Sequence, residues 1–416
     1  MNRGAGVKFS VVIPTRERSD TLTATLKTCV GQNYKNLEII VSDNYSQDNT
    51  RGVVESFSDK RIRYTNTLKR VGMSQNWEHA FSLVTGDFVM FLGDDDGLLP
   101  GAISRIAEIL TRVEWNVFAW KPATYYWGQS AIVANRFKLV IPWGKTEPVE
   151  RAGLKILRDV LKQRQPYFEL PMPYIRSFVR TQLLHKLKAQ AGRLFCSRIP
   201  DVFLGVAVAN QAGDYGFSFE PYSIGGVSQH STGASSLNPA ATRKPEELFL
   251  SEDNLDFHPE LEYAPLTELV LWEAVLQVRD HFGMSHEILS CLDESEHLVW
   301  CVRQASRLPA QRYALCMGIL AQIARKKNFQ REFEGARIRF LNKEQSERVE
   351  VNGYNIRYHQ LVFDCSHIAD RTVFGASQLC TNLIEARNSN LFNLSNSALI
   401  ATNIRLLSQK VKRLGL

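Results

Sequence analysis

The sequence predicts an α/β protein whose mostly parallel sheet carries helices on both faces. Within residues 1–110, short apolar runs alternate with helix-like segments in a regular strand–helix order. Polar residues also follow three of the apolar runs directly, at the points where the strands are expected to end. Because ligands of open α/β sheets bind at the carboxyl ends of the strands, these polar residues mark a candidate site.

The expected strands of this first part are short and apolar. Residues 9–13 read Phe-Ser-Val-Val-Ile and end at Pro14, which cannot donate a sheet hydrogen bond. Residues 88–92 are apolar throughout, as in a strand buried on both faces. In chain order, the expected elements are strand 9–13, helix 21–30, strand 37–41, helix 50–57, strand 61–64, helix 72–84, strand 88–92 and helix 101–110.

The remaining chain divides near residue 237. Residues 1–236 are interpreted as one domain, with a first half at 1–110 and a second half at 111–236, and residues 237–416 as a mostly helical C-terminal domain of unknown role. Asn352-Gly353 predicts the turn of a hairpin. The other expected elements are strands 118–120, 124–127 and 215–220, helices 151–161, 181–189, 200–211, 266–282, 294–306 and 309–326, and hairpin strands 349–351 and 354–363.

A final helix is expected at residues 403–416, with apolar residues on one face and lysine and arginine on the rest. Two interpretations stay open: a helix on a membrane surface, or a helix packed on its own domain or on a second subunit. The C-terminal region is thus a candidate for peripheral membrane contact or for a homo-oligomer.

Composition narrows the class of partner. The chain has 416 residues and a formal net charge of 50 − 43 = +7, which suits nucleotide phosphates or a lipid surface. No dense basic tract with interleaved aromatic residues is present, so nucleic acid is not the expected partner.

The cysteines and the N-terminus bear on the compartment. Seven scattered cysteines without a CxxC pair argue against a disulfide framework or a zinc site. The first residues lack the apolar core of a signal peptide, and no stretch approaches the length of a membrane span. A cytoplasmic protein is expected, at most resting on the inner face of the membrane.

Three consecutive carboxylates, Asp94, Asp95 and Asp96, follow the apolar strand at 88–92 after Gly93. Adjacent like charges repel one another, so a fold gathers them where something offsets the charge. Mg²⁺ or Mn²⁺ takes carboxylate oxygens and leaves positions open for phosphate. The alternative is a solvated acidic turn at a strand end.

The segments FSVVIPTRERSDTLTATLKTCVGQNYKNLEIIVSDNYSQDNT and FLGDDDGLLP together resemble the nucleotide-binding half of GT-A fold glycosyltransferases. The nearest resemblance is to the large inverting family that contains bacterial polysaccharide and O-antigen sugar transferases. It is strong over residues 1–110 and continues weakly to residue 236. It implies a GT-A (Rossmann-like) mixed, mainly parallel sheet flanked by helices, followed here by a mostly helical C-terminal domain.

The resemblance also implies residue roles. Asp43 resembles the aspartate that accepts a hydrogen bond from the base, and Asp95 the metal-binding residue of a DxD-type motif. Relatives often carry an additional aspartate at the place of Gly93. The implied nucleotide-sugar-binding residues are Pro14, Thr15, Arg16, Asp43, Arg70, Gly72, Asn76 and Asp94, and the implied metal ligands are Asp95, Asp96 and His230.

Asp201 is the candidate catalytic base, because relatives place an acidic pair at the start of a helix near the acceptor. Here the pair is Pro200-Asp201, and the alternative for Asp201 is a helix cap. The implied activity is metal-assisted, inverting transfer of a sugar from a nucleotide-diphosphate donor to a hydroxyl of a glycan or lipid-linked acceptor, in surface polysaccharide biosynthesis. The alternatives are a sugar nucleotidyltransferase, which would want a glycine-rich loop that PTRERSD lacks, and a non-catalytic nucleotide-sugar-binding module.

Overall fold

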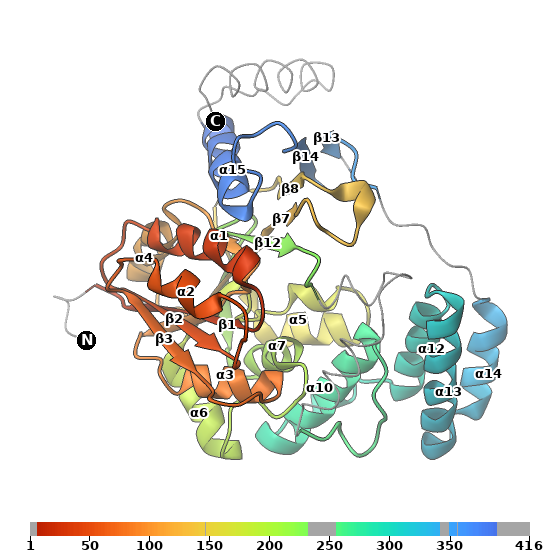
Figure 1. Ribbon diagram of the computed structural model, residues 1–416. Helices are drawn as coiled ribbons and strands as arrows, with labels where there is room; N and C mark the ends of the chain where they lie inside the picture. Colours follow the sequence, from red (N-terminus) through yellow and green to blue (C-terminus); the bar gives the residue numbers. More distant parts are fainter. Residues whose placement is uncertain (1–5, 146, 232–254, 342–348, 356, 389–416) are drawn as a thin grey trace.

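The computed structural model describes residues 6–145, 147–231, 255–341, 349–355 and 357–388 (Figure 1). The predicted helix at 403–416 and the predicted domain boundary at residue 237 lie outside the described residues. In the described part, no helix is both long enough and apolar enough to cross a bilayer. All seven cysteines are buried and free.

An eight-stranded mixed sheet forms the centre of the N-terminal part, as the predicted fold class requires. Its order is β3-β2-β1-β4-β10-β6-β11-β9, and the neighbours β3, β2, β1 and β4 are mutually parallel. The strands are β1 (Phe9–Thr15), β2 (Leu37–Asp43), β3 (Ile62–Asn66), β4 (Phe88–Phe91), β6 (Val117–Trp120), β9 (Val149–Ala152), β10 (Ser177–Arg180) and β11 (Asp214–Ser218).

Side chains of this sheet alternate between two apolar layers. In β1, Val12 packs into one core while Val11 and Ile13 pack into the other, and all three are fully buried. The two-sided burial explains why the central strands are apolar throughout. Helices on the two faces are α1 (Ser19–Val30), α2 (Thr50–Glu55) and α4 (Ala102–Arg112), opposite α3 (Met73–Phe81), α5 (Gly153–Leu161), α6 (Thr181–Ala191) and α7 (Pro200–Gln211).

A second sheet, mainly antiparallel, was not predicted. Its order is β13-β14-β8-β7-β12-β5, and it packs under α15 (Val373–Asn388), which also contacts α1 (Figure 1). Its strands are β5 (Gly97–Leu98), β7 (Ala123–Tyr126), β8 (Lys138–Pro142), β12 (Ser223–Val227), β13 (Gly353–Asn355) and β14 (Gln360–Asp364).

The predicted Asn352-Gly353 turn is wrong, because Gly353 begins β13 and pairs with Val362. Strand β14 pairs with β8 and α15 contacts α1, so these C-terminal elements pack on the N-terminal part of the chain. The helical part of the C-terminal region comprises α10 (Thr267–Phe282), α11 (His286–Leu289), α12 (Glu294–Ala305), α13 (Ala310–Lys327) and α14 (Gln330–Arg339), and the short 3-10 helices are η1 (Val133–Asn135) and η2 (Tyr167–Glu169).

Helix α10 joins this helical group to the first part of the chain, because it packs on α7 as well as on α12. At the contact with the first part, Glu273 of α10 is fully buried and accepts hydrogen bonds from Ser197 Oγ (2.7 Å) and Gln277 Nε2 (2.8 Å). The carbonyl of Ser197 in turn accepts from Ser74 Oγ at 2.5 Å. A buried polar chain therefore connects α10 with α3 and with the loop before α7.

Glu273→Gln is expected to stabilise the protein at neutral and alkaline pH. Burial raises the pKa of Glu273 from its ordinary 4.5 to about 7, against the hydrogen bonds from Ser197 and Gln277. A raised carboxyl pKa contributes stability that is complete below pH 4.5 and is lost as the pH rises through 7. The amide removes this loss, on the order of 1–3 kcal/mol at pH 8. Urea unfolding at pH 5 and 8 measures it, with exposed Glu334→Gln as the control; an unchanged pH dependence would contradict the assignment.

Candidate active site

Three strand ends meet at one edge of the large sheet. The parallel register pairs Thr15 at the end of β1 with Asp43 at the end of β2. On the other side of β1, Leu92 N donates to Val12 O at 2.8 Å, so the turn after β4 begins beside the end of β1. The predicted common edge for Thr15, Asp43 and the three aspartates is confirmed.

Asp43 is buried and is held by three hydrogen-bond donors at this edge. Its Oδ1 accepts from Ser46 N at 2.9 Å, and its Oδ2 accepts from the Tyr64 hydroxyl at 2.7 Å and from Asn66 Nδ2 at 3.1 Å. These three donors come from the β2–α2 loop and from β3. The carboxylate is thus held in one orientation, with further lone pairs for a ligand N–H.

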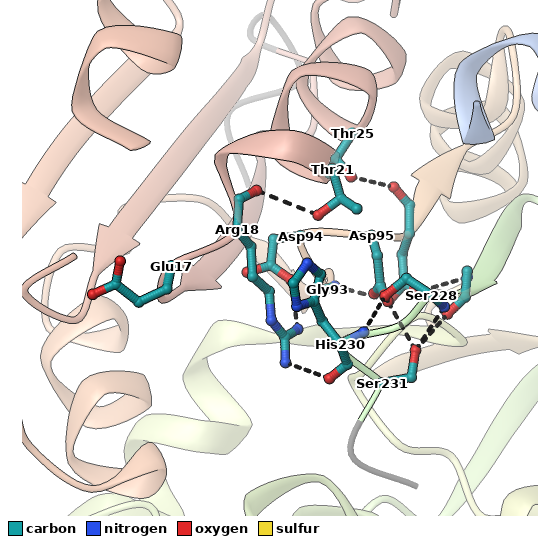
Figure 2. Close-up of polar contacts among 12 residues, drawn as sticks. Glu17, Arg18, Thr21, Thr25, Gly93, Asp94, Asp95, Ser228, His230 and Ser231 are labelled. Atoms are coloured by element: carbon teal, nitrogen blue, oxygen red, sulfur yellow. Dashed lines mark hydrogen bonds and ion pairs between the residues drawn. The ribbon is translucent and has the colours of Figure 1, made fainter. Parts of the chain in front are cut away.

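Asp94 forms the main ion pair of the site. Arg18 Nη1 lies 2.7 Å from Asp94 Oδ1, and Arg18 Nη2 donates to His230 O at 2.9 Å (Figure 2). Burial raises the pKa of Asp94, although the Arg18 charge opposes it. Burial disfavours the charged form of Arg18, but Asp94 and Asp95 outweigh it and raise the guanidinium pKa. Arg18 therefore places a fixed positive charge at the strand edge.

Asp95 is oriented by two serines from the far end of the first part of the chain. Its Oδ2 accepts from Ser228 Oγ at 2.6 Å and from Ser231 Oγ at 2.9 Å (Figure 2). Its carbonyl accepts from Trp127 Nε1 at 3.0 Å. No described residue donates a hydrogen bond to Asp95 Oδ1, so this oxygen is the one available to a ligand.

Asp96 points into the fold. Gly93 N donates to its Oδ2 at 2.9 Å and Gly226 N to its Oδ1 at 2.7 Å. Burial raises its pKa well above the ordinary value, and the neighbouring Asp95 charge adds to the rise. This geometry favours a structural role, holding β12 against the aspartate turn, over the predicted role as a metal ligand.

Gly93→Ala is expected to destabilise the turn, because a Cβ at this position would lie 2.4 Å from Asp96 Oδ2 and 2.7 Å from the Tyr174 hydroxyl. Overpacking of this kind typically costs about 1–3 kcal/mol. Thermal unfolding measures the effect. The control is Gly318→Ala in α13, where the new Cβ meets nothing within 4 Å. Equal unfolding temperatures for the two variants would contradict the close packing at Gly93.

The backbone of His230 faces the site, and its imidazole ring contacts Asp20. His230 Nε2 lies 2.9 Å from Asp20 Oδ2 in α1, and His230 N donates to Ser228 Oγ at 3.1 Å. The segment that carries the two serines is thereby tied to α1 across the aspartate turn. The ring–carboxylate contact competes with the predicted metal-ligand role of His230.

The other predicted nucleotide-binding residues lie along the same edge with different partners. Asn76 is buried and exchanges hydrogen bonds with Ser42, as Ser42 Oγ donates to Asn76 Oδ1 at 2.7 Å and Asn76 Nδ2 donates to Ser42 O at 3.1 Å. Arg70 Nη2 pairs with Glu17 Oε1 at 2.5 Å. The remaining members of the set are Pro14 and Arg16, which are partly exposed at and after the end of β1, and Gly72, which caps α3.

Asp201 is the second residue of α7 and follows Pro200, the first residue of the helix. Burial raises its pKa, against hydrogen bonds from backbone N–H groups and the positive charge of Arg176. The Tyr174 phenol has its pKa raised first by burial and then by Asp96, Asp95, Asp201 and Asp94. The charges of Asp201 and of the triple-aspartate turn therefore both act on the Tyr174 phenol.

A divalent cation fits this edge with few ligands from the chain. No group of three or more His, Cys, Asp or Glu side chains suited to a metal is found in the described residues. Asp95 Oδ1 accepts no hydrogen bond from the described residues, and Asp94 is beside it in the chain. Mg²⁺ commonly takes one or two carboxylates and completes its shell with water and substrate phosphate. The donor set therefore fits a cation that arrives with a diphosphate.

The sequence interpretation missed four residues of this site: Arg18, Ser228, Ser231 and Tyr174. Arg18 lies in the segment PTRERSD, and Ser228 and Ser231 lie within two residues of the predicted metal ligand His230. Nothing in the sequence pairs them with Asp94 and Asp95, because the partners in each pair lie far apart in the chain.

Together, the fold and the site define an α/β protein with an acidic ligand site at the carboxyl edge of its parallel strands. Residues 10–147 match the family described as Glycosyl transferase family 2. This match agrees with the family that the sequence motifs predicted, and it includes the three strand ends.

Similar proteins include bacterial sugar transferases. Over 104 residues the chain is 40% identical to the Campylobacter jejuni GalNAc(5)-diNAcBac-PP-undecaprenol beta-1,3-glucosyltransferase, covering 24% of this chain and 34% of that protein. Over 87 residues it is 33% identical to the Escherichia coli UDP-Glc:alpha-D-GlcNAc-diphosphoundecaprenol beta-1,3-glucosyltransferase WfgD, covering 21% of this chain and 34% of that one. The chain thus matches about a third of the length of these relatives. Among solved structures, S. aureus TarS 1–349 in complex with UDP-GlcNAc is similar with a TM-score of 0.45 and 18% identity, covering 83% of this chain and 96% of that chain.

Proposed function

We propose that the protein is an inverting glycosyltransferase that moves a sugar from a nucleotide diphosphate to a hydroxyl of a glycan or lipid-linked acceptor. The observation that carries the proposal is the set of oriented carboxylates at the strand edge, Asp43, Asp94 and Asp95, in a chain with a Glycosyl transferase family 2 domain. The relatives named for transfer to diphosphoundecaprenol-linked sugars support a lipid-linked acceptor and a role in surface polysaccharide assembly.

The donor site follows from the strand edge. Asp43 accepts an N–H of the base, and the predicted residues along the same edge, at the end of β1 and at the start of α3, contact the nucleoside. Arg18 and Asp94 lie where the diphosphate enters. Asp95, through Oδ1, would hold Mn²⁺ or Mg²⁺ together with the diphosphate oxygens, and the bound cation would neutralise the departing nucleoside diphosphate.

The acceptor side needs one base. Asp201 removes the proton of the attacking hydroxyl while the oxygen bonds to the anomeric carbon and the bond to the diphosphate breaks. The transition state has oxocarbenium character, as in glycoside hydrolysis. A single displacement inverts the anomeric centre, so an α-linked donor gives a β-linked product.

This chemistry requires a location on the side of the membrane where nucleotide sugars are made. We therefore propose a cytoplasmic protein that meets its acceptor at the inner membrane surface. We also propose that the C-terminal region provides a peripheral membrane contact or a homo-oligomer contact.

The test is nucleoside diphosphate release from a panel of nucleotide sugars, with and without acceptor and with Mn²⁺, Mg²⁺ or EDTA. A glycosyltransferase shows metal-dependent release that acceptor stimulates. Release of pyrophosphate from a nucleoside triphosphate and a sugar phosphate would instead identify a nucleotidyltransferase. Binding of donors without any release would identify a non-catalytic module.

A further inference from the structure

The loop before α7 is held by a carboxylate that belongs to the C-terminal helical group. Ser197 of this loop is fully buried, and its Oγ donates a hydrogen bond to Glu273 Oε2 of α10 at 2.7 Å. Glu273 is fully buried as well, and its other oxygen accepts from Gln277 Nε2 at 2.8 Å, a contact that stays within α10. Buried polar groups keep such partners, so the Glu273–Ser197 bond fixes the loop against α10.

Ser197 passes this constraint to the start of α7. Its Oγ also accepts a hydrogen bond from Ile199 N at 3.3 Å, which closes a short turn of the kind that serine favours. Ile199 is the N-cap of α7, and its carbonyl accepts from Phe203 N at 3.2 Å at the beginning of the helix. Asp201 follows two positions after Ile199. The proposed base is therefore attached to a helix start that Glu273 holds through Ser197.

The backbone of Ser197 reaches the donor side through a separate contact. Its carbonyl accepts from Ser74 Oγ in the first turn of α3 at 2.5 Å. Asn76 of the same helix exchanges hydrogen bonds with Ser42, the residue before Asp43 at the end of β2. The Ser197 hydroxyl thus contacts the start of α7, whereas its carbonyl contacts α3. A mutation of the side chain therefore separates the two contacts.

We infer that Glu273 is a positioning residue for sugar transfer, which sets the start of α7, and with it Asp201, through the hydroxyl of Ser197. This inference rests on the proposed function. It gives the C-terminal helical group a part in catalysis, because α10 packs on α12 as well as on α7. A displacement of a catalytic group by about 1 Å can lower a rate on the order of 10²-fold, so release of the loop should be visible in kcat.

Two variants separate this role from stability, because each removes one side-chain donor to the same buried carboxylate. Ser197→Ala removes the link to α7, and Gln277→Leu, the matched control, removes the link within α10. Comparable falls in the unfolding temperature are expected, since each variant loses one buried hydrogen bond to a carboxyl group.

Transfer is measured with the nucleotide sugar and the acceptor that give the most release in the donor panel. We expect kcat to fall about 10- to 100-fold in Ser197→Ala and to stay within about twofold of the wild type in Gln277→Leu. The dissociation constant of the donor should be unchanged in both variants, because the Ser197 carbonyl still accepts from Ser74.

Replacement of Glu273 itself gives a second comparison. Glu273→Leu should lose transfer as Ser197→Ala does, and Glu273→Gln, whose amide oxygen still accepts from the Ser197 hydroxyl, should restore kcat. If Glu273→Leu does not fold, the comparison of Ser197→Ala with Gln277→Leu decides the inference.

Three results would count against this role. Wild-type kcat in folded Ser197→Ala, or an equal fall of kcat in Gln277→Leu, would overturn the inference and leave the proposed function in place. A raised dissociation constant of the donor as the main effect of Ser197→Ala would also overturn it, by assigning the contact to the donor side. Absence of transfer by the wild-type protein with every donor would contradict the proposed function itself, and the inference with it.

Discussion

Asp201→Asn is expected to lower sugar transfer about 10²- to 10⁴-fold, the usual contribution of a general base, without weakening the binding of the donor. The amide preserves the size of the side chain and its place at the start of α7, but it cannot take a proton. The donor edge, with Asp43, Asp94 and Asp95, lies on other elements and stays intact. The loss should therefore appear in kcat and leave the dissociation constant of the donor unchanged.

The measurement pairs a transfer assay with calorimetric titration of the donor, and the control is Asp214→Asn. Asp214 is exposed at the start of β11, just beyond the same helix, so its replacement should change neither quantity. Transfer at the wild-type rate by Asp201→Asn would show that the base is elsewhere. Loss of donor binding would show instead that the residue supports the fold.

The pH dependence of the wild-type protein provides a second check on Asp201. Burial raises the pKa of this carboxyl, and the base must be ionised to act. Transfer should thus decline on the acid side at a pH above the ordinary range of an aspartate, and it should recover on return to neutral pH. An acid limb that persists unchanged in the residual activity of Asp201→Asn would assign the titration to another group.

The site at the edge of the sheet was predictable because the residues that follow neighbouring parallel strands lie at the same edge. Polar residues that follow consecutive buried strands must meet, and Thr15, Asp43 and Asp94 do. The alternation of strands and helices predicted parallel strands, and therefore predicted that this edge carries their carboxyl ends. The periodicity says nothing about the direction of a side chain in a turn, so the inward orientation of Asp96 was not predictable.

Long-range contacts account for most of the site and fold features that the sequence did not predict. Arg18 meets Asp94 because the neighbouring strands β1 and β4 end side by side. Ser228 meets Asp95 because β12 passes beside the aspartate turn, where a Cβ on Gly226 would lie 1.9 Å from Asp95 O. The second sheet is equally hidden, since β8 and β14 pair although they lie in distant parts of the chain. Short strands of this kind are too brief for a period of two to stand out.

Asp95→Asn is expected to abolish the dependence of donor binding on Mn²⁺ or Mg²⁺ and to lower transfer by about 10³-fold or more, as loss of several kcal/mol of charge stabilisation requires. The amide still accepts hydrogen bonds from Ser228 and Ser231, so the turn keeps its shape. The substitution removes the negative charge, including its share at Oδ1, an oxygen that accepts no hydrogen bond from the described residues. The effect therefore belongs to the ligand and not to the fold.

Calorimetric titration of nucleoside diphosphate with and without Mn²⁺ measures the first effect directly, independently of turnover. Exposed Glu55→Gln serves as the charge control, because its pair with Arg51 on α2 is a surface contact of small value. In the wild-type protein the cation should tighten nucleotide binding, and in Asp95→Asn the two titrations should coincide. If Mn²⁺ still tightened binding in Asp95→Asn, Asp94 would hold the cation, and the Arg18–Asp94 pair would have to open for it to do so.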